Sequence, residues 1–367
     1  MTTRKKEKAV FVVTTGISLC GRKEMFFPRF EENCVQGKKK IKIYNIGDIL
    51  LPWLWAKTKE EIPKERILNA DPLLLKVIQA GVLQDIKDSL KQDMEENDAV
   101  FLNLHTVFEW RNISLPSLNS IFLRELINLD LEPDMFVCFI DNAEDILCRL
   151  NNSDQWKKQE FSEGDVWKWQ NHEVDNTREY TYLFDKKKKF FVMPIRQPSK
   201  TLYYLLFEPW RPIIYAQMPI SHATVKELKK VKKFIEKVRK WAVVFDPLTI
   251  ETGVVELDKS DETEVKVRNN QTAHRDVQWF IPQSDICMAY YIKVVFTAGV
   301  VDETVIASQR GKEAWVIFPE DHSPFLPYRA TRSIFRNPEE FLEFFEKEFL
   351  KEIVEKWEQE HGEKIEW

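Results

Sequence analysis

Apolar runs alternate with amphipathic segments through the first half of the chain. The runs AVFVV (residues 9–13), DAVFLNLH (98–105) and PDMFVCFID (133–141) predict buried strands, because their apolar residues are contiguous rather than spaced. Between them, residues 72–96 carry apolar side chains at the spacing of a long helix. Strands that are apolar on both faces belong in a sheet covered by helices on both sides. The pattern therefore predicts a doubly wound parallel sheet.

The same alternation begins again after Pro209 and Pro212, which flank a predicted linker. We expect a first domain over residues 1–208, a linker over 209–212 and a second domain over 213–367. The expected fold class is α/β, with two Rossmann-like three-layer domains, each built on a mostly parallel sheet flanked by helices.

The chain ends in a long amphipathic helix. Asn337 is a good N-cap, Pro338 a good first helical residue, and Gly362 marks the helix end. We expect its phenylalanines to pack internally rather than against a second subunit, although a homo-oligomer stays an open alternative. These phenylalanines are Phe341, Phe344, Phe345 and Phe349.

The composition narrows the class of protein. The chain has 367 residues, 44% of them hydrophobic, and a net charge of −5, which argues against general nucleic-acid binding. Its five cysteines form no C-x-x-C pair, so neither a disulfide framework nor a metal site is expected. The apolar part of the basic start is too short for a signal peptide, and no stretch approaches the length of a membrane span. We therefore expect a cytoplasmic protein, and the scarcity of glycine favours a heat-adapted source.

A glycine-rich loop follows the first predicted strand. Gly16 and Gly21 have the spacing of the phosphate-binding motif G-x-x-x-x-G-K-[S/T], in which backbone N–H groups cradle an anion. Here Arg22 stands at the lysine position and Lys23 at the hydroxyl position. Arginine binds phosphate with a different geometry from lysine, and a lysine cannot ligate Mg²⁺. The loop therefore predicts phosphate binding at Gly16, Gly21, Arg22 and Lys23 without standard Mg²⁺-assisted transfer. The alternative is a tight turn that binds no ligand.

Residues 8–180 resemble the P-loop nucleoside-monophosphate kinases. The resemblance rests on TTGISLCGRKE, on AVFLNLHTVFEWRN as a third strand and following turn, and on PDMFVCFIDNAEDILCRL. It implies that Asp141 and Arg149 handle phosphate or belong to a lid, and that ATP or another nucleotide is bound. The alternatives are a helix N-cap for Asp141 and a surface ion pair for Arg149. His105 follows a strand at a position where α/β folds bind ligands, although a structural role is the simpler reading.

Residues 213–325 are similar to the nucleoside 2-deoxyribosyltransferase family. The most specific signal is a helix of the form G-x-x-x-E-x-x-x-A-x-x-x-G-K, which runs from Gly299 to Lys312. The resemblance implies that Glu303 is the nucleophile and Asp285 the acid or base-orienting group. It also implies that Tyr215 orients the carboxylate.

The same resemblance gives three further residues a binding role. Ser221 and the backbone after Pro219 would hold a 5′-phosphate or hydroxyl, and Arg275 would contact phosphate. The alternatives are a solvated helix residue for Glu303, a turn residue for Asp285 and a surface pair for Arg275 with Asp276.

Together these features predict a nucleotide-binding protein of nucleotide metabolism. It would act by phosphoryl transfer to a nucleotide, by N-glycosidic cleavage through Glu303, or by both. The alternative is a non-catalytic nucleotide sensor or a regulatory or defence protein that uses the same pockets. In either case the expected partner is a small-molecule nucleotide or nucleoside, with no membrane involved.

Overall fold

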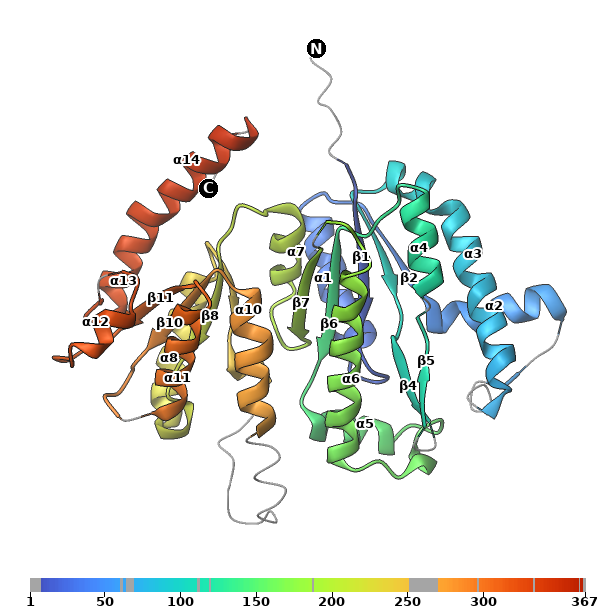
Figure 1. Ribbon diagram of the computed structural model, residues 1–367, viewed down its shortest axis with the longest axis horizontal. Coiled ribbons are helices and arrows are strands. Elements are labelled where there is room, and N and C mark those ends of the chain that lie inside the picture. Colours follow the sequence, from blue (N-terminus) through green and yellow to red (C-terminus); the bar gives the residue numbers. More distant parts are fainter. Residues whose placement is uncertain are drawn as a thin grey trace. The chain divides into compact units, whose positions relative to one another are not determined.

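The computed structural model describes residues 8–59, 62–63, 69–110, 113–118, 120–186, 188–250, 270–295, 297–332, 334–362 and 364–365. The chain divides into two compact units, Met1–Ser199 (unit 1) and Lys200–Trp367 (unit 2) (Figure 1). The polar segment 251–269 lies outside the described residues.

Five parallel strands form the sheet of unit 1, in the order β2-β3-β1-β6-β7. Val12 of β1 is level with Phe101 of β3 on one side and with Met135 of β6 on the other. Every residue of β3 and β6 is buried, as a parallel sheet covered on both faces requires. The strands are β1 (Val10–Thr15), β2 (Ile41–Asn45), β3 (Ala99–Asn103), β6 (Met135–Ile140) and β7 (Lys189–Pro194).

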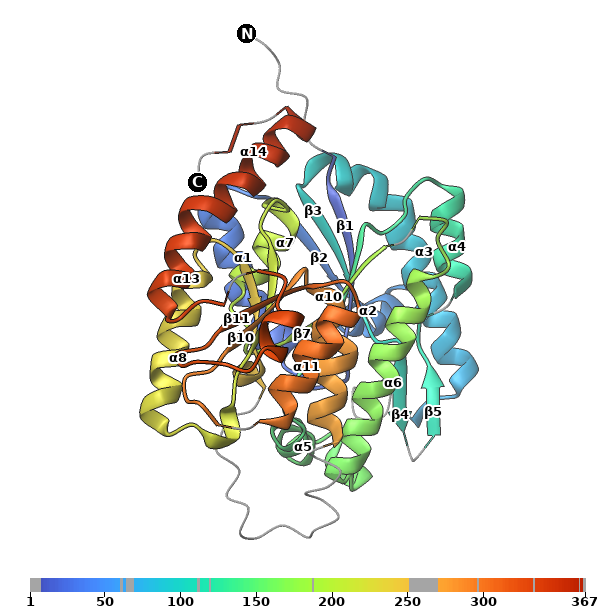
Figure 2. The same cartoon turned by 60° about the vertical axis from the view of Figure 1, so that its left-hand side comes forward.

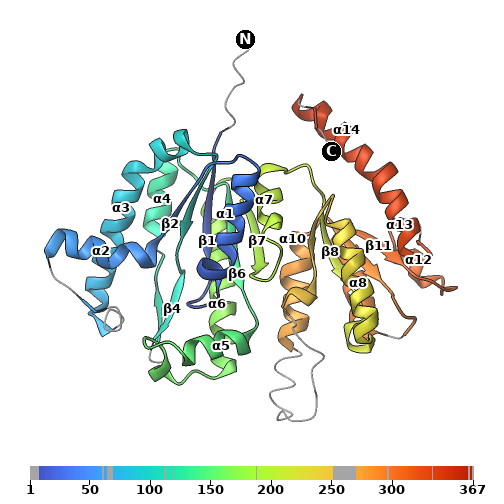
Figure 3. The ribbon, with the colours of Figure 1, turned by 180° about the vertical axis from the view of Figure 1, so that it is seen from behind.

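Helices cover both faces of this sheet. On one face the rings of Phe27 and Phe30 pack against Phe101, so α1 covers this face and lies in front of the sheet in Figure 3. On the other face α3 and α4 contribute to a core that includes Phe11 and Val13 of β1. The helices are the π-helical turn η1 (Arg22–Phe26), α1 (Phe27–Gln36), α2 (Ile46–Thr58), α3 (Pro72–Glu96), α4 (Ser120–Asn128), α5 (Ala143–Asn151) and α6 (Glu163–Thr181).

Unit 1 also contains an antiparallel hairpin where the sequence predicted only a turn. Strands β4 (Val107–Trp110) and β5 (Ile113–Pro116) pair directly after β3. The hairpin is short, and its buried side chains alternate too briefly to give a clear strand period.

Unit 2 has a sheet of four parallel strands, in the order β11-β10-β8-β9. The strands are β8 (Ile213–Gln217), β9 (Val243–Phe245), β10 (Ile286–Tyr290) and β11 (Glu313–Ile317). The helices are α7 (Lys200–Phe207), α8 (Val225–Val238), α10 (Ile281–Gln283) after the π-helical turn η6 (Asp276–Phe280), α11 (Ala298–Gln309), α12 (Phe325–Arg329), α13 (Pro338–Phe344), η7 (Phe345–Phe349) and α14 (Leu350–His361). Both units are therefore α/β, each with a parallel sheet flanked by helices.

The C-terminal helix is part of the core of unit 2. Phe341 and Phe345 are fully buried and lie against Trp315 of β11, in one cluster with Phe234 of α8. Figure 2 shows α13 and α8 on the same side of this sheet. The internal packing predicted for these two phenylalanines is confirmed.

No helix in the described part of the chain is long and apolar enough to span a membrane.

Candidate functional site

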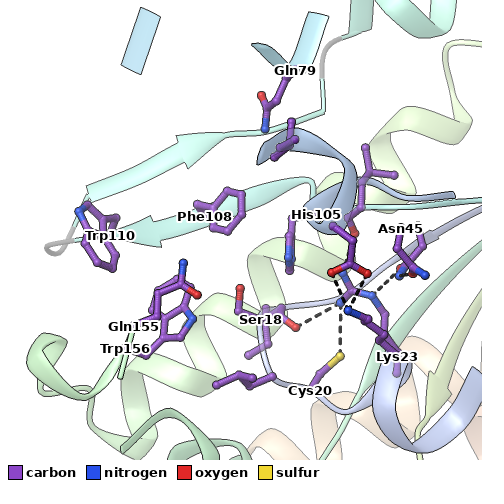
Figure 4. Close-up of a pocket in the computed structure, with 18 of the residues that line it drawn as sticks. Ser18, Cys20, Lys23, Asn45, Gln79, His105, Phe108, Trp110, Gln155 and Trp156 are labelled. Atoms are coloured by element: carbon purple, nitrogen blue, oxygen red, sulfur yellow. Dashed lines mark hydrogen bonds and ion pairs between the residues drawn. The ribbon is translucent and has the colours of Figure 1, made fainter. Parts of the chain in front are cut away.

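A cavity of about 290 Å³ lies in unit 1, next to the carboxyl ends of β1, β2 and β3. One wall is the loop after β1 with the first residues of η1, and the opposite wall is the hairpin β4–β5 (Figure 4). Helices α2 and α3 and the segment around Trp156 contribute the remaining walls. Open α/β sheets bind ligands at this edge, because the loops that follow the strands meet there.

The loop after β1 requires glycine at both predicted positions. Gly16 has φ 147° and Gly21 has φ 96°, a region that side chains with a Cβ rarely adopt. A Cβ on Gly16 would lie 2.7 Å from the carbonyl oxygen of Phe139, and one on Gly21 would lie 2.7 Å from Nη1 of Arg149. The two glycines therefore allow other groups to approach the loop closely.

The Arg22 side chain is buried inside this loop. Its Nε donates to Asn103 Oδ1 at 2.6 Å, and its Nη2 donates to the carbonyl of Leu104 at 2.9 Å. Nη1 donates to the carbonyl oxygens of Gly16 and Ile17. All three guanidinium nitrogens therefore donate to protein acceptors, and only 7% of the residue is exposed.

The start of the loop, Gly16 and Ile17, presents carbonyl oxygens to a cation. An anion cradle needs N–H groups that converge on the ligand. The N–H of Gly16 instead donates to Glu173 Oε1 at 3.0 Å. The side chain predicted to bind phosphate thus holds the loop closed from within.

Glu173 of α6 is the buried anion beneath the loop. Besides Gly16, it accepts hydrogen bonds from the N–H and the hydroxyl of Thr106 and from the N–H of Val107, at 2.8 to 2.9 Å. Burial raises the pKa of Glu173 above its ordinary value, and the hydrogen bonds from Thr106 and the charge of Arg22 oppose this rise. Four donors that converge on two oxygens favour the ionised carboxylate.

Sequence reasoning missed Glu173, although a signal existed. The residue lies on the buried stripe of α6 with Trp169, Val174 and Thr177. An acidic residue in an otherwise buried stripe of a helix needs strong partners, so its position alone marks it for attention.

His105 completes the contacts of Gly16. Its Nδ1 lies 2.6 Å from the Gly16 carbonyl oxygen, and its ring packs on Phe108 with centroids 4.6 Å apart. Burial and the nearby charge of Arg22 lower the pKa of His105 well below its ordinary value of 6.5. A neutral imidazole that donates from Nδ1 to the carbonyl accounts for this geometry.

The cavity has one polar and one aromatic end. At the polar end Lys23 is exposed and forms an ion pair with Asp48 of α2 at 2.6 Å. At the aromatic end Phe108, Trp110 and Trp156 line the wall, and the rings of Trp110 and Trp156 meet edge to face at 5.4 Å (Figure 4). Gln155 lies beside this aromatic wall.

Asp141 and Arg149 contact each other beside the loop rather than inside the cavity. Arg149 Nη2 pairs with Asp141 Oδ2, and Arg149 Nη1 donates to the Leu19 carbonyl at 2.7 Å. Burial raises the pKa of Asp141, against the lowering effect of Arg149. The N-cap of α5 is Asn142, so Asp141 does not cap this helix.

In unit 2 the structure brings Tyr215 and Glu303 into one neighbourhood. Tyr215 is fully buried, and its pKa is raised well above 10 by burial and then by the charges of Asp276 and Glu303. Arg275 donates to Asp276 at 3.0 Å, and both residues are buried, so they are not the surface pair considered above.

Asp285 lies at the opposite edge of the unit 2 sheet from Pro219. Its Oδ2 accepts from the N–H of Ile213 at 3.0 Å, at the amino end of β8, whereas Pro219 follows the carboxyl end of the same strand. At 3.3 Å per residue the first and last residues of β8 are about 13 Å apart. The structure therefore does not bring Asp285 together with Pro219, and the side chain of Ser221 lies outside the described residues.

Within the part of the chain that the structure describes, no group of three or more His, Cys, Asp or Glu residues is arranged to hold a metal ion.

The contacts of Glu173 predict that its carboxylate stabilises unit 1. Glu173→Gln places an amide N–H₂ among backbone donors, so we expect a loss of about 2–4 kcal/mol in the free energy of unfolding of unit 1. Denaturation in urea measures this change. The control is Glu179→Gln, an exposed position on the same helix, which should stay within about 0.5 kcal/mol of the wild type. An unchanged stability of Glu173→Gln would contradict the role assigned to this carboxylate.

The lowered pKa of His105 predicts how the stability of unit 1 depends on pH. Because the pKa of His105 is lower in the folded than in the unfolded protein, its contribution to stability is complete above pH 6.5 and is lost as the pH falls below that value. Unfolding measured at decreasing pH should show this loss in the wild type and less of it in His105→Gln. His361→Gln, at an exposed histidine, is the control. An NMR titration that placed the pKa of His105 at or above 6.5 would contradict the assignment.

The chain is similar to known proteins only at the level of solved structures. No protein-family model matches the chain, and no curated protein matches it significantly. Similar solved structures include deoxyadenosine kinase from M. mycoides (12% identity, 55% of this chain and 98% of that chain, TM-score 0.29). Shikimate kinase from Bacteroides thetaiotaomicron (10%, 54% and 98%, TM-score 0.29) and thymidylate kinase from Candida albicans (13%, 55% and 92%, TM-score 0.29) also match. At these scores the likeness carries no argument about substrate or catalytic residues, and the chemistry of the site rests on its own geometry.

Proposed function

We propose that unit 1 is a nucleotide-binding module that does not perform standard Mg²⁺-assisted phosphoryl transfer. The observation that carries this proposal is the closed loop, in which Arg22 donates to Asn103 and to backbone carbonyl oxygens. A guanidinium whose nitrogens already donate to these partners cannot also bind and stabilise a phosphoryl group during its transfer. Lys23, at the position of the metal-binding hydroxyl, cannot ligate Mg²⁺.

The aromatic end of the cavity supports binding of a nucleobase. Phe108, Trp110 and Trp156 offer ring surfaces, and stacking on aromatic side chains stabilises bound bases by about 1–3 kcal/mol per base. The amide of Gln155 can exchange hydrogen bonds with the edge of a base in the manner of protein–nucleic acid contacts. A cavity of about 290 Å³ is at the small end of the range for small-molecule sites, which suits a nucleoside.

The polar end supports a secondary contribution from phosphate. Lys23 and Lys76 both line the cavity, but Lys23 is already paired with Asp48. A bound phosphate has to compete with this carboxylate for the ammonium group. We therefore expect the base and sugar to supply most of the affinity and each phosphate to add little.

These features favour the sensor alternative over the kinase. A sensor needs selective binding, which an aromatic wall and a few polar groups provide, whereas a kinase needs a cation and a metal that follow the transferred group.

Binding and turnover can be tested together with a panel of nucleosides, nucleoside monophosphates and ATP, with and without Mg²⁺. We expect saturable binding of at least one compound by calorimetry, no effect of Mg²⁺, and no new product by mass spectrometry. Trp110→Ala should weaken binding about tenfold or more, because a stacking surface is lost. Trp357→Ala, in unit 2, is the matched control. Phe108→Leu provides a second measurement that retains apolar packing if Trp110→Ala loosens the fold.

Three outcomes would contradict the proposal. Failure of every compound to bind would remove the nucleotide-binding module. ADP together with a new diphosphate would establish a kinase. Free base released in the wild type and not in Glu303→Ala would contradict the expected absence of products, because it would place chemistry in unit 2, as the resemblance to deoxyribosyltransferases implies.

A further inference from the structure

Helix α8 carries a stripe of exposed lysines. Its buried residues Val231, Phe234, Ile235 and Val238 fix one face against the sheet, so the opposite face is exposed. Residues 225–240 contain eight basic and two acidic residues, a net charge of +6 in a chain whose total is −5. The exposed lysines of this stripe are Lys226, Lys229, Lys230, Lys232, Lys233, Lys237 and Lys240.

The two acidic residues of α8 offset only a small part of this positive charge, although the charge of Lys230 acts on Glu227. Glu227 is engaged in the capping box with Thr224, where it accepts from the Thr224 N–H at 2.7 Å. Glu236 pairs with Arg239 at 2.5 Å. Among the residues that the structure describes, the stripe lysines form no ion pair. Lysines three and four residues apart on one helix repel each other, so the stripe destabilises α8 unless an anionic partner covers it.

The C-terminal helix carries the opposite charge. Residues 338–361 contain nine glutamates and three lysines, a net charge of −6. Each of the three lysines pairs within the helix, as Lys347 does with Glu343 at 2.8 Å. Glu348 and Glu352 are exposed and have no partner among the described residues. The C-terminal helix therefore keeps an excess of negative charge after its internal ion pairs are counted.

The two charged surfaces are neighbours on one face of unit 2. The rings of Phe234 in α8 and Phe341 in α13 meet at 5.6 Å, and Trp241 Nε1 donates to Glu346 at 3.3 Å. Figure 2 shows the two helices on the same side of the sheet. A positive and a negative surface on the same side of one sheet are complementary to themselves after a two-fold rotation.

We propose that this face of unit 2 binds a second copy of the chain. The lysine stripe of each copy covers the acidic C-terminal helix of the other in a symmetric dimer. The lengths agree, since the 14 residues of α8 span about 21 Å and the 12 residues of α14 about 18 Å at 1.5 Å per residue. In α14 only Leu350 and Val354 are buried, which leaves most of this helix available for a partner.

A second copy fits this surface better than a nucleic acid. A phosphate backbone laid on α8 would also approach the glutamates of the adjacent helix, where Glu346 contacts Trp241. Like charges brought together in this way reduce affinity. A partner with a negative and a positive surface next to each other is complementary in charge to both helices.

A charge swap tests the proposal by sedimentation velocity at several protein concentrations. We expect the full chain to dimerise at low ionic strength and to dissociate as salt screens the contacts. Lys229→Glu/Lys233→Glu and Glu348→Lys/Glu352→Lys should each raise the dimer Kd about tenfold or more. The variant that combines all four changes restores complementarity and should return the Kd to within about threefold of the wild type.

The control reverses two exposed lysines of unit 1, Lys91→Glu/Lys168→Glu, with the same change in net charge. It should leave the Kd unchanged. A wild type that stays monomeric at low salt would overturn the proposal, as would a combined variant that remains monomeric while folded. Binding of a duplex RNA that is lost in Lys229→Glu/Lys233→Glu, with no dimer, would identify a different partner and also overturn it.

Discussion

Gly16 links a buried cation to a buried anion, and the site of unit 1 depends on this link. Its N–H donates to Glu173, while its carbonyl oxygen accepts from Arg22 and lies against His105. A charge that leaves water must find strong partners, or its burial destabilises the fold. Here backbone groups and polar side chains provide these partners for both charges. The loop is therefore held in one conformation from two sides.

A phosphate-binding loop usually does two things: it forms a turn beside a cavity, and it supplies a cation to the ligand. In the part of unit 1 that the structure describes, only the first of these is seen. The strand, the glycines and the helix that follows still place a loop beside a cavity at the carboxyl edge of the sheet. The guanidinium of Arg22 at the end of the loop, however, donates its hydrogen bonds to protein groups. The other groups that line the cavity include the aromatic side chains of Phe108, Trp110 and Trp156, the amide of Gln155 and the ammonium groups of Lys23 and Lys76. On the function proposed above, these groups would recognise a ligand.

The sequence was sufficient for the architecture because parallel sheets have a strong signature. Contiguous apolar runs such as residues 135–140 and the long amphipathic segment 72–96 are strands and helices in the structure. Gly16 and Gly21 could also be singled out, because their spacing after a strand is distinctive. The burial of Phe341 followed from its place on the apolar face of a helix.

The partners of the charged residues could not be predicted in the same way. Arg22 donates hydrogen bonds to Asn103 and Leu104, which are more than 80 positions away in the sequence. Glu173 accepts a hydrogen bond from Val107, which is 66 positions away. Local pattern gives no information on such contacts, since they depend on how loops after different strands meet. The same reason explains why the contact of Asp285 with the N–H of Ile213, 72 positions away, could not be predicted.

We infer that the Arg22 guanidinium stabilises the loop through protein contacts and is not a phosphate ligand. NMR of the arginine Nε–Hε group, with Arg22 assigned by substitution, tests it directly. We predict that the Arg22 Hε exchanges slowly with solvent and that its resonance is unchanged when ATP and Mg²⁺ are added. A fast-exchanging Hε, or one that shifts with ATP in step with saturable binding, would contradict the account and return Arg22 to the role of a phosphate ligand.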